Sequence, residues 1–554
     1  MKMKKLLCIL LCIGLVASAF AGCAPNNEKI DLIYPFGGNV NSYDPQIAST
    51  ADEFVIIENC FEGLVRCDDE GNILPGCATS WTVSDNGLVY TFNIMKGLHW
   101  YVYNSVKKRM GSDYDPEITA RDFVFALQRA VDPTTSAPLY STISGIVNAN
   151  QINSGIMNKS NLGVRAIDDY TLEIRLTSPD SGFLQTLSTA IAMPCNEEFF
   201  NKTNGRYGLD LQYTMFNGQF VVTNELDTSY ILKKSISTKD GVQTNGYRGP
   251  SPAKASVLTL KIVGENENIT DRLKSGYYDA AYIKGSESAA ISNKNGLTLV
   301  PYSNTTWSLV MNSGKGILSS VNARHAIALS LSEAQLEGYP YLTKATGFIP
   351  PSCTAGNGAY TDIGYNITEK QNPEKAVSLW KKAVGDTSIY TIELKFLAPD
   401  YMETLAKQLL QGLQSSIGSI SNAEADKKIA FTLKLETKPE SELKAAVASG
   451  NYDIAIYPLA ASASSPVSFL QSFLTAGVSS FDTKDFSAAV KAAGTASAAN
   501  LAKECFNCEK LLLSSYCYVP LFFESSYYAA AKGVSGVQFH PGTGRVCFVY
   551  TDRV

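Results

Sequence analysis

Apolar and polar positions alternate along the chain with two periods, which predict strands and helices in turn. A period of two with β-branched and aromatic residues is typical of half-buried strands. A period near 3.6 with a capping residue in front is typical of helices that bury one face. Strands are predicted at 30–35, 90–94, 170–174, 257–263, 390–394 and 430–435. Helices are predicted at 53–65, 119–131, 321–331, 372–383, 401–417 and 499–513.

Two of the predicted helices have a clear apolar face. The segment 119–131 starts with a capping threonine and places Phe123, Leu127 and Ala130 together. The segment 53–65 places its apolar residues at helical spacing from Phe54 to Leu64. Strands and helices that alternate over 554 residues predict an α/β protein with more than one sheet and several domains.

The first 22 residues are typical of an export signal. Three lysines precede an apolar run at 6–16, and small residues follow it. Ala-Phe-Ala-Gly-Cys at 19–23 resembles the bacterial lipobox, in which the cysteine receives a lipid and becomes the new N-terminus. We therefore expect a lipoprotein signal at 1–22, lipidation at Cys23 and a tether at 23–29. The alternative is an ordinary secretory signal in which Cys23 has no role.

Charge and motif content argue against several functions. The chain has 47 basic and 52 acidic residues, and loss of the three lysines of the signal takes its net charge from −5 to −8. This balance argues against nucleic-acid binding. Only three histidines are present, and no nucleophile-elbow, zinc-protease or phosphate-loop motif occurs. We expect no catalytic residues, no metal site and no cofactor.

Cysteine use leaves alternatives open. Two of the twelve cysteines leave with the signal and one is Cys23. Export permits disulfides among the other nine, but an odd number leaves one unpaired within the chain. Cys505 and Cys508 form one isolated CxxC motif, which indicates packing or a disulfide more than a redox site. The nine are Cys60, Cys67, Cys77, Cys195, Cys353, Cys505, Cys508, Cys517 and Cys547.

A series of short motifs follows in a familiar order. It includes Phe-Glu-Gly-Leu-Val at 61–65, Gly-Phe-Ile-Pro-Pro at 347–351 and Gly-Asn-Tyr-Asp at 450–453. Further pieces lie at 71–75, 80–92, 118–125, 162–172, 217–220, 273–279 and 321–326. Together they resemble extracellular solute-binding protein family 5, the oligopeptide- and dipeptide-binding lipoproteins of ABC importers.

The resemblance implies a fold and a function. The fold would be periplasmic-binding-protein-like class II, with two lobes, a hinge and an extra third domain. Lobe I would comprise 30–54, 180–284 and 522–554, the extra domain 55–179, and lobe II 285–521. The lobes would close on an extracellular peptide or related small solute and deliver it to a permease with its ATPase. We expect a monomer on the outer face of the bacterial cytoplasmic membrane, attached only through its lipid and exposed to periplasm or cell exterior.

The resemblance also implies ligand-binding positions, with one departure. Peptide binders of the family carry Trp and Asp after the late Tyr-Asp strand, and a count without gaps puts Leu459 and Ser462 there. Either another carboxylate replaces that Asp, or the ligand is not a peptide with a free N-terminus. A non-peptide ligand such as a metal chelate, sugar or haem is one alternative. A sensory or structural lipoprotein that kept the fold is a further alternative. Trp307 is equally compatible with a core position. The implied ligand-binding residues are Ser49, Thr50, Asn304, Thr306, Trp307, Tyr457, Leu459, Ala460 and Ser462.

Overall fold

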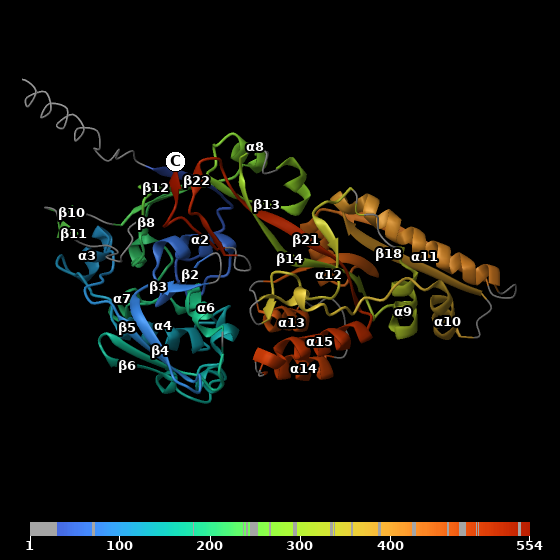
Figure 1. Cartoon of the computed structure of the whole chain (residues 1–554), viewed down its shortest axis with the longest axis horizontal. Helices are drawn as coiled ribbons and strands as arrows, with labels where there is room; N and C mark the ends of the chain where they lie inside the picture. Colours follow the sequence, from blue (N-terminus) through green and yellow to red (C-terminus); the bar gives the residue numbers. More distant parts are fainter. Residues whose placement is uncertain are drawn as a thin grey trace, which may run out of the picture.

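The computed structural model places two groups of elements side by side (Figure 1). No helix among the described residues is long and apolar enough to cross a membrane. The predicted signal, tether and Cys23 lie outside the described residues. The structure describes residues 30–554 except 69–71, 181, 236–237, 240–241, 244–252, 265–266, 292–295, 333–335, 337, 356–357, 386–388, 424–427, 462–464, 476–482, 495, 497, 541–544 and 554.

The first group contains a four-stranded sheet in the order β1-β12-β9-β8. β1 and β12 are parallel, with Asp31 opposite Val257 and Phe36 opposite Ile262. The other two pairs are antiparallel. The inward residues of β1 are fully or nearly buried, as the alternating pattern predicts. The strands are β1 Asp31–Phe36, β8 Phe220–Leu226, β9 Ser229–Lys234 and β12 Val257–Ile262.

A second, antiparallel sheet of the first group has the order β4-β5-β7-β6. Helix α4 packs against it and begins after Thr119, whose side chain forms a capping box with Asp122. Phe123, Leu127 and Ala130 are buried, which confirms the predicted face. The elements are β4 Ala78–Val83, β5 Val89–Ile94, α4 Ala120–Val131, β6 Val164–Asp168 and β7 Thr171–Arg175.

Helix α2 (Ala51–Cys60) is shorter than predicted. The expected helix reached residue 65, but Phe61 has extended backbone angles and the chain then enters β2 (Val65–Cys67). Gly218 explains the early end, because a Cβ there would lie 2.4 Å from the carbonyl carbon of Cys60. The prediction was wrong at this boundary because tertiary packing overrides the helical spacing of Phe61 and Leu64.

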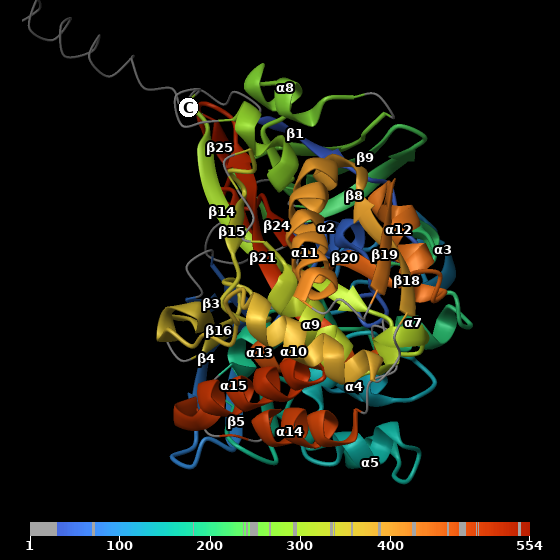
Figure 2. The same cartoon turned by 90° about the vertical axis from the view of Figure 1, so that its right-hand side faces the viewer.

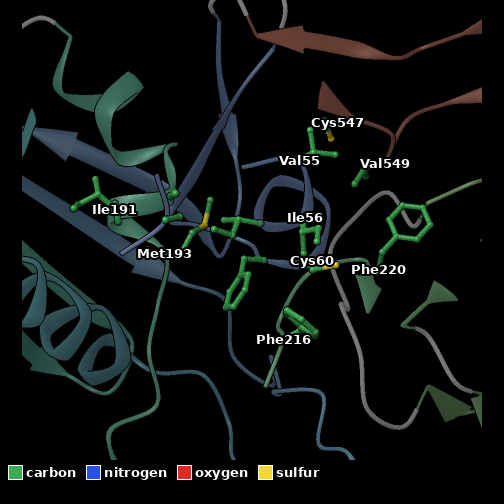
Figure 3. Close-up of a cluster of buried hydrophobic side chains, with 14 of the residues drawn as sticks. Val55, Ile56, Cys60, Ile191, Met193, Phe216, Phe220, Cys547 and Val549 are labelled. Carbon is green, nitrogen blue, oxygen red and sulfur yellow. The ribbon is translucent and has the colours of Figure 1, made fainter. Parts of the chain in front are cut away.

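One hydrophobic core connects distant segments of the first group (Figure 3). Val55 and Cys60 of α2 are buried with Met193, Phe216 and Val549. Asn59 adds polar links, since its amide donates to the carbonyl of Val546 at 2.7 Å and accepts from the amide of Phe548. The end of α2 therefore packs directly on the C-terminal segment. The remaining helices here are α3 Asn104–Met110, α5 Ala149–Asn153, α6 Phe183–Leu187, α7 Glu197–Lys202 and α8 Ile269–Lys274.

The second group is built on a seven-stranded sheet in the order β13-β21-β14-β20-β18-β19, with β15 also pairing with β21. The predicted strands at 390–394 and 430–435 form the parallel pair β18 and β19. The strands are β13 Ala280–Ile283, β14 Thr298–Met311, β15 Leu342–Lys344, β18 Ile389–Pro399, β19 Lys428–Lys438, β20 Ile454–Ala460 and β21 Tyr518–Ala530.

Alternation along these strands divides the helices between two faces. Leu309 and Met311 share a core with α9, α10 and α11, whereas Val310 belongs to the core of α12, α13, α14 and α15. Figure 2 shows α13, α14 and α15 gathered together. The helices are α9 Val321–Ser330, α10 Pro373–Val384, α11 Glu403–Ala423, α12 Glu440–Ala448, α13 Pro466–Thr475, α14 Lys484–Gly494 and α15 Ala498–Ser514.

Two long strands, β14 and β21, connect the groups. Tyr302 and Tyr528 belong to the core of the first group, whereas Trp307 and Phe522 belong to a core of the second. The ladder between β14 and β21 is irregular at Tyr302/Thr305 and at Trp307/Ser308. We call residues 302–307 and 522–528 the junction.

Candidate ligand site at the junction

The structure brings together six of the residues implied as ligand contacts. β14 and β20 pair antiparallel, with Thr305 opposite Ala460, Thr306 opposite Leu459 and Trp307 opposite Pro458. The side-chain amide of Asn304 donates to the carbonyl of Ala461 at 3.2 Å. The six residues are Asn304, Thr306, Trp307, Tyr457, Leu459 and Ala460, and all lie on these two strands.

These six residues differ in how far their side chains are buried. Trp307 is 1% exposed, and Thr306 is fully buried with its hydroxyl donating to the carbonyl of Phe348 at 2.6 Å. Tyr457 and Leu459 are half-buried, and Ala460 is exposed. In this conformation Trp307 and Thr306 support the wall of the site rather than present their side chains to solvent.

Ser49 and Thr50 lie in the other group, at the start of α2. The Thr50 hydroxyl caps the helix by accepting from the amide of Glu53 and donates to the carbonyl of Asn39 at 2.8 Å. The backbone amide of Ser49 donates to the Glu53 carboxylate at 2.7 Å, and its side chain is exposed. Thr50 is thus committed to the helix, and Ser49 keeps an available hydroxyl. Ser462, the ninth residue, lies outside the described residues.

Sequence reasoning missed a carboxylate at the junction, Glu524 of β21. It lies opposite Thr305 in the ladder, so both side chains share the face that also carries Ala460. The indole nitrogen of Trp307 donates to Glu524 Oε2 at 2.6 Å. Glu524 is the single charged residue of an otherwise apolar and hydroxyl-bearing strand, and that contrast is the signal by which it could have been found.

A second carboxylate, Glu440, begins α12. Its Oε2 accepts from the hydroxyl of Tyr401 at 3.2 Å, and Lys444 one turn later pairs with Oε1 at 2.6 Å. The Tyr401 ring meets the Trp307 ring edge-on, with centroids 6.4 Å apart. Tyr401 therefore links the two carboxylates.

The backbone explains why these residues meet. β18 and β19 end side by side, with Pro399 opposite Lys438. Tyr401 and Glu440 each follow two residues later, before helices that cover opposite faces of the sheet. In α/β sheets, ligands bind beyond the carboxyl ends of strands where successive connections leave on opposite faces. We call Trp307, Tyr341, Tyr401, Glu440 and Glu524 the carboxylate–aromatic cluster.

The two carboxylates of this cluster differ in their electrostatics. Burial opposes charge on Glu440, but its pairing with Lys444 outweighs burial and lowers the pKa of Glu440. Burial raises the pKa of Glu524; the Trp307 hydrogen bond opposes that rise and the nearby Glu440 charge adds to it. Burial, followed by the charge of Glu524, raises the pKa of Tyr341 to about 12. No ion pair joins Glu524 to a cation within the described part of the chain, where Lys284 is a nearby but exposed lysine.

Other possible sites have weaker chemistry. No group of three or more His, Cys, Asp or Glu side chains among the described residues has the geometry to hold a metal ion. Burial raises the pKa of the Cys508 thiol to about 11 and that of Cys505 further, so the CxxC motif lacks the thiolate that redox chemistry requires. A surface hollow of about 590 Å³ beside α8 is open and lined by polar residues such as Glu267 and Arg272.

Comparison with known proteins identifies the family. The model of bacterial extracellular solute-binding proteins, family 5, matches residues 72–481. A dipeptide-binding protein of Lactococcus lactis is 24% identical over 98% of both chains. A probable deoxycholate-binding periplasmic protein of Escherichia coli is 28% identical over 69% of both chains.

Solved structures agree on the fold. The substrate-binding domain of an oligopeptide ABC transporter from Bacillus anthracis superposes with a TM-score of 0.70 at 23% identity, over 95% of this chain and all of that one. The protein therefore has the two-lobe, periplasmic-binding-protein-like α/β fold, and it belongs to the bacterial extracellular solute-binding proteins of family 5.

Proposed function

We propose that this chain is the substrate-binding lipoprotein of an ABC importer for peptides. It captures extracellular peptides between two closing lobes and delivers them to a membrane permease with its ATPase. The family match over residues 72–481 carries the proposal, and the dipeptide-binding relative supports the ligand class. The family is one of transport and not of catalysis, which agrees with the lack of enzyme motifs in the sequence.

The division of the cores supports a two-lobe mechanism. Most residues of one hydrophobic core come from lobe I (30–54, 180–284 and 522–554) and the extra domain (55–179), and nearly all residues of the other two come from lobe II (285–521). The first strand of lobe II begins on the lobe I side, since Tyr302 packs there. Among the described strands and helices, only β14 and β21 belong to the cores of both lobes, so rotation about the junction would close the lobes with the cores intact.

The lipobox at 19–23 supports attachment through a lipid on Cys23 to the outer face of the cytoplasmic membrane, as a monomer exposed to periplasm or cell exterior. Cells expressing a Cys23→Ala variant should release the protein into the soluble fraction. Retention of that variant in the membrane fraction would contradict lipid anchoring. Size-exclusion chromatography with light scattering tests the monomer.

A non-peptide ligand is the second candidate. It is favoured by Leu459 and Ser462, which replace the usual Trp and Asp, and by the deoxycholate-binding relative. Mass spectrometry of small molecules released by denaturing the purified mature protein separates the candidates. We expect a mixture of short peptides. Recovery of a bile acid, sugar, haem or metal chelate without peptides would overturn the peptide assignment and leave the solute-binding class intact.

A further inference from the structure

The carboxylate–aromatic cluster contains one carboxylate, Glu524, that forms no ion pair with a described cation. Glu524 is half-buried and accepts hydrogen bonds from the Trp307 indole and the Gly285 amide, and the nearby Lys284 is exposed. Glu440 is paired with Lys444, whose side chain is 48% exposed and therefore screened by water. A partly buried carboxylate without an ion-pair partner is costly, so a cationic group of a ligand would stabilise it.

A second, independent feature is an unused hydroxyl in the same place. Tyr341 is 6% exposed, and its hydroxyl has no hydrogen-bond partner among the described residues. A Cβ added to Gly285 would lie 2.8 Å from the Tyr341 ring and 2.9 Å from Glu524 Oε1, so both side chains pack against that glycine. The Tyr341 hydroxyl is also an electrostatic neighbour of Glu524 and Tyr401. The hydroxyl is not among the fully enclosed polar atoms that lack a partner, so it reaches solvent and is available to a ligand.

The walls of the cluster are aromatic. The rings of Trp307 in β14, Tyr341 just before β15 and Tyr401 just before α11 are neighbours of one another and of the carboxylates. Aromatic faces attract organic cations, and carboxylates donate nothing and accept only. An anion or a neutral acceptor would meet two carboxylates here. An ammonium group on an aliphatic stem matches both the charge and the apolar surroundings.

We propose that the carboxylate–aromatic cluster is the subsite of this solute-binding protein that receives a primary ammonium group of the ligand, with Glu524 as its ion-pair partner. This inference deepens the proposed function and rests on it. Two sources have the same chemistry, namely the α-ammonium of a peptide and the side-chain ammonium of a lysine. The subsite supplies the carboxylate that is absent at Ser462.

Isothermal titration calorimetry on the full mature chain with three probes tests the proposal and distinguishes the sources. The probes are tetra-alanine, N-acetyl-tetra-alanine and N-acetyl-Ala-Lys-Ala-Ala. Glu524→Gln is the test variant, because an amide oxygen still accepts from the Trp307 indole. Glu442→Gln is the matched control, since Glu442 lies exposed on the same helix as Glu440.

In the wild type, the probes that carry the recognised ammonium should bind tighter than N-acetyl-tetra-alanine. Glu524→Gln should weaken the binding of the probe that carries the recognised ammonium on the order of 10- to 100-fold. It should leave the binding of N-acetyl-tetra-alanine, which has no ammonium group, unchanged. A selective effect on tetra-alanine assigns the α-ammonium, and one on the lysine probe assigns the side chain. Equal binding of all probes in both proteins would overturn the subsite while the peptide-binding function stands.

If no peptide binds, the proposed function is contradicted, and a second measurement still tests the subsite. The chain has four tryptophans, so its indole ¹⁵N–¹H signals are few, and a Trp307→Phe variant assigns the relevant one. Hexylammonium should shift the Trp307 signal in the wild type and not in Glu524→Gln, and hexan-1-ol should not shift it. No shift specific to the amine in the wild type would overturn the subsite.

Discussion

Glu509 and Glu524, two carboxylates at least partly buried, show how a structural acid differs from one available to a ligand. Glu509 of α15 accepts from the amides of Phe348 and Ile349 at 2.6 and 2.9 Å and from the Tyr360 hydroxyl at 2.7 Å. Glu524 at the junction accepts from the Trp307 indole and the Gly285 amide and lies near another carboxylate, Glu440. Glu509 uses its carboxylate oxygens for hydrogen bonds within the fold, whereas Glu524 can still accept hydrogen bonds from a ligand.

The largest expected loss of stability among the variants follows truncation of Glu509. Glu509→Ala removes the acceptor of two buried backbone amides, each costing about 1–3 kcal/mol when unsatisfied, so we expect the free energy of unfolding to fall by about 3–4 kcal/mol. Urea denaturation followed by circular dichroism measures it. A loss below about 1 kcal/mol would mean that the loop at 347–351 finds other partners.

The pH dependence is the next largest effect. Burial raises the pKa of Glu509 to about 7, above its ordinary value of 4.5. The folded state therefore holds more protons than the unfolded state between these values, and stability falls as pH rises through that window, by about 2–3 kcal/mol. Comparison of urea midpoints at pH 5 and pH 8 in the wild type and in Glu509→Gln isolates this contribution. Identical pH profiles for the two proteins would refute it.

Substitution of Gly347 tests the close approach of the loop at 347–351 to Glu509. A Cβ at this position would lie 2.5 Å from Glu509 Oε1, a hydrogen-bonded and therefore immobile atom. Gly347→Ala should lower the thermal midpoint through a destabilisation of about 2 kcal/mol. Gly145→Ala is the control, because a Cβ there meets no atom within 4 Å. Equal midpoints for the two variants would show that Glu509 moves aside at little cost.

The smallest stability effect is expected at the junction. Glu524→Gln keeps an acceptor for the Trp307 indole and removes repulsion from Glu440, so the free energy of unfolding should change by less than about 1 kcal/mol. The same urea experiment measures it. A large loss of stability would make Glu524 a structural acid like Glu509 and remove the contrast between the two regions.

Local patterns in the sequence predicted much of the fold. Thr119, as a capping residue, places the start of α4, the predicted helix at 372–383 corresponds to α10, and alternation along 390–394 places part of β18. The early end of α2 was not predictable, because it depends on Gly218, more than 150 residues away in the sequence.

The candidate site was predictable only in part. Motif order implied the residues of β14 and β20, and the structure pairs them. Glu524 was missed because a single acid in a strand is compatible with an exposed edge. Its importance depends on Tyr401 and Glu440, which only the assembled sheet brings near it.

The buried thiols allow the unfolding of separate parts of the protein to be measured. The structure records no disulfide for the cysteines at 60, 77, 195 and 547 in the first core or for those at 505, 508 and 517 in lobe II. Because these thiols are buried, an alkylating reagent modifies each one only when the surrounding segment unfolds. Peptide mapping after brief alkylation in increasing urea would therefore give a separate unfolding curve for each lobe, without any introduced label.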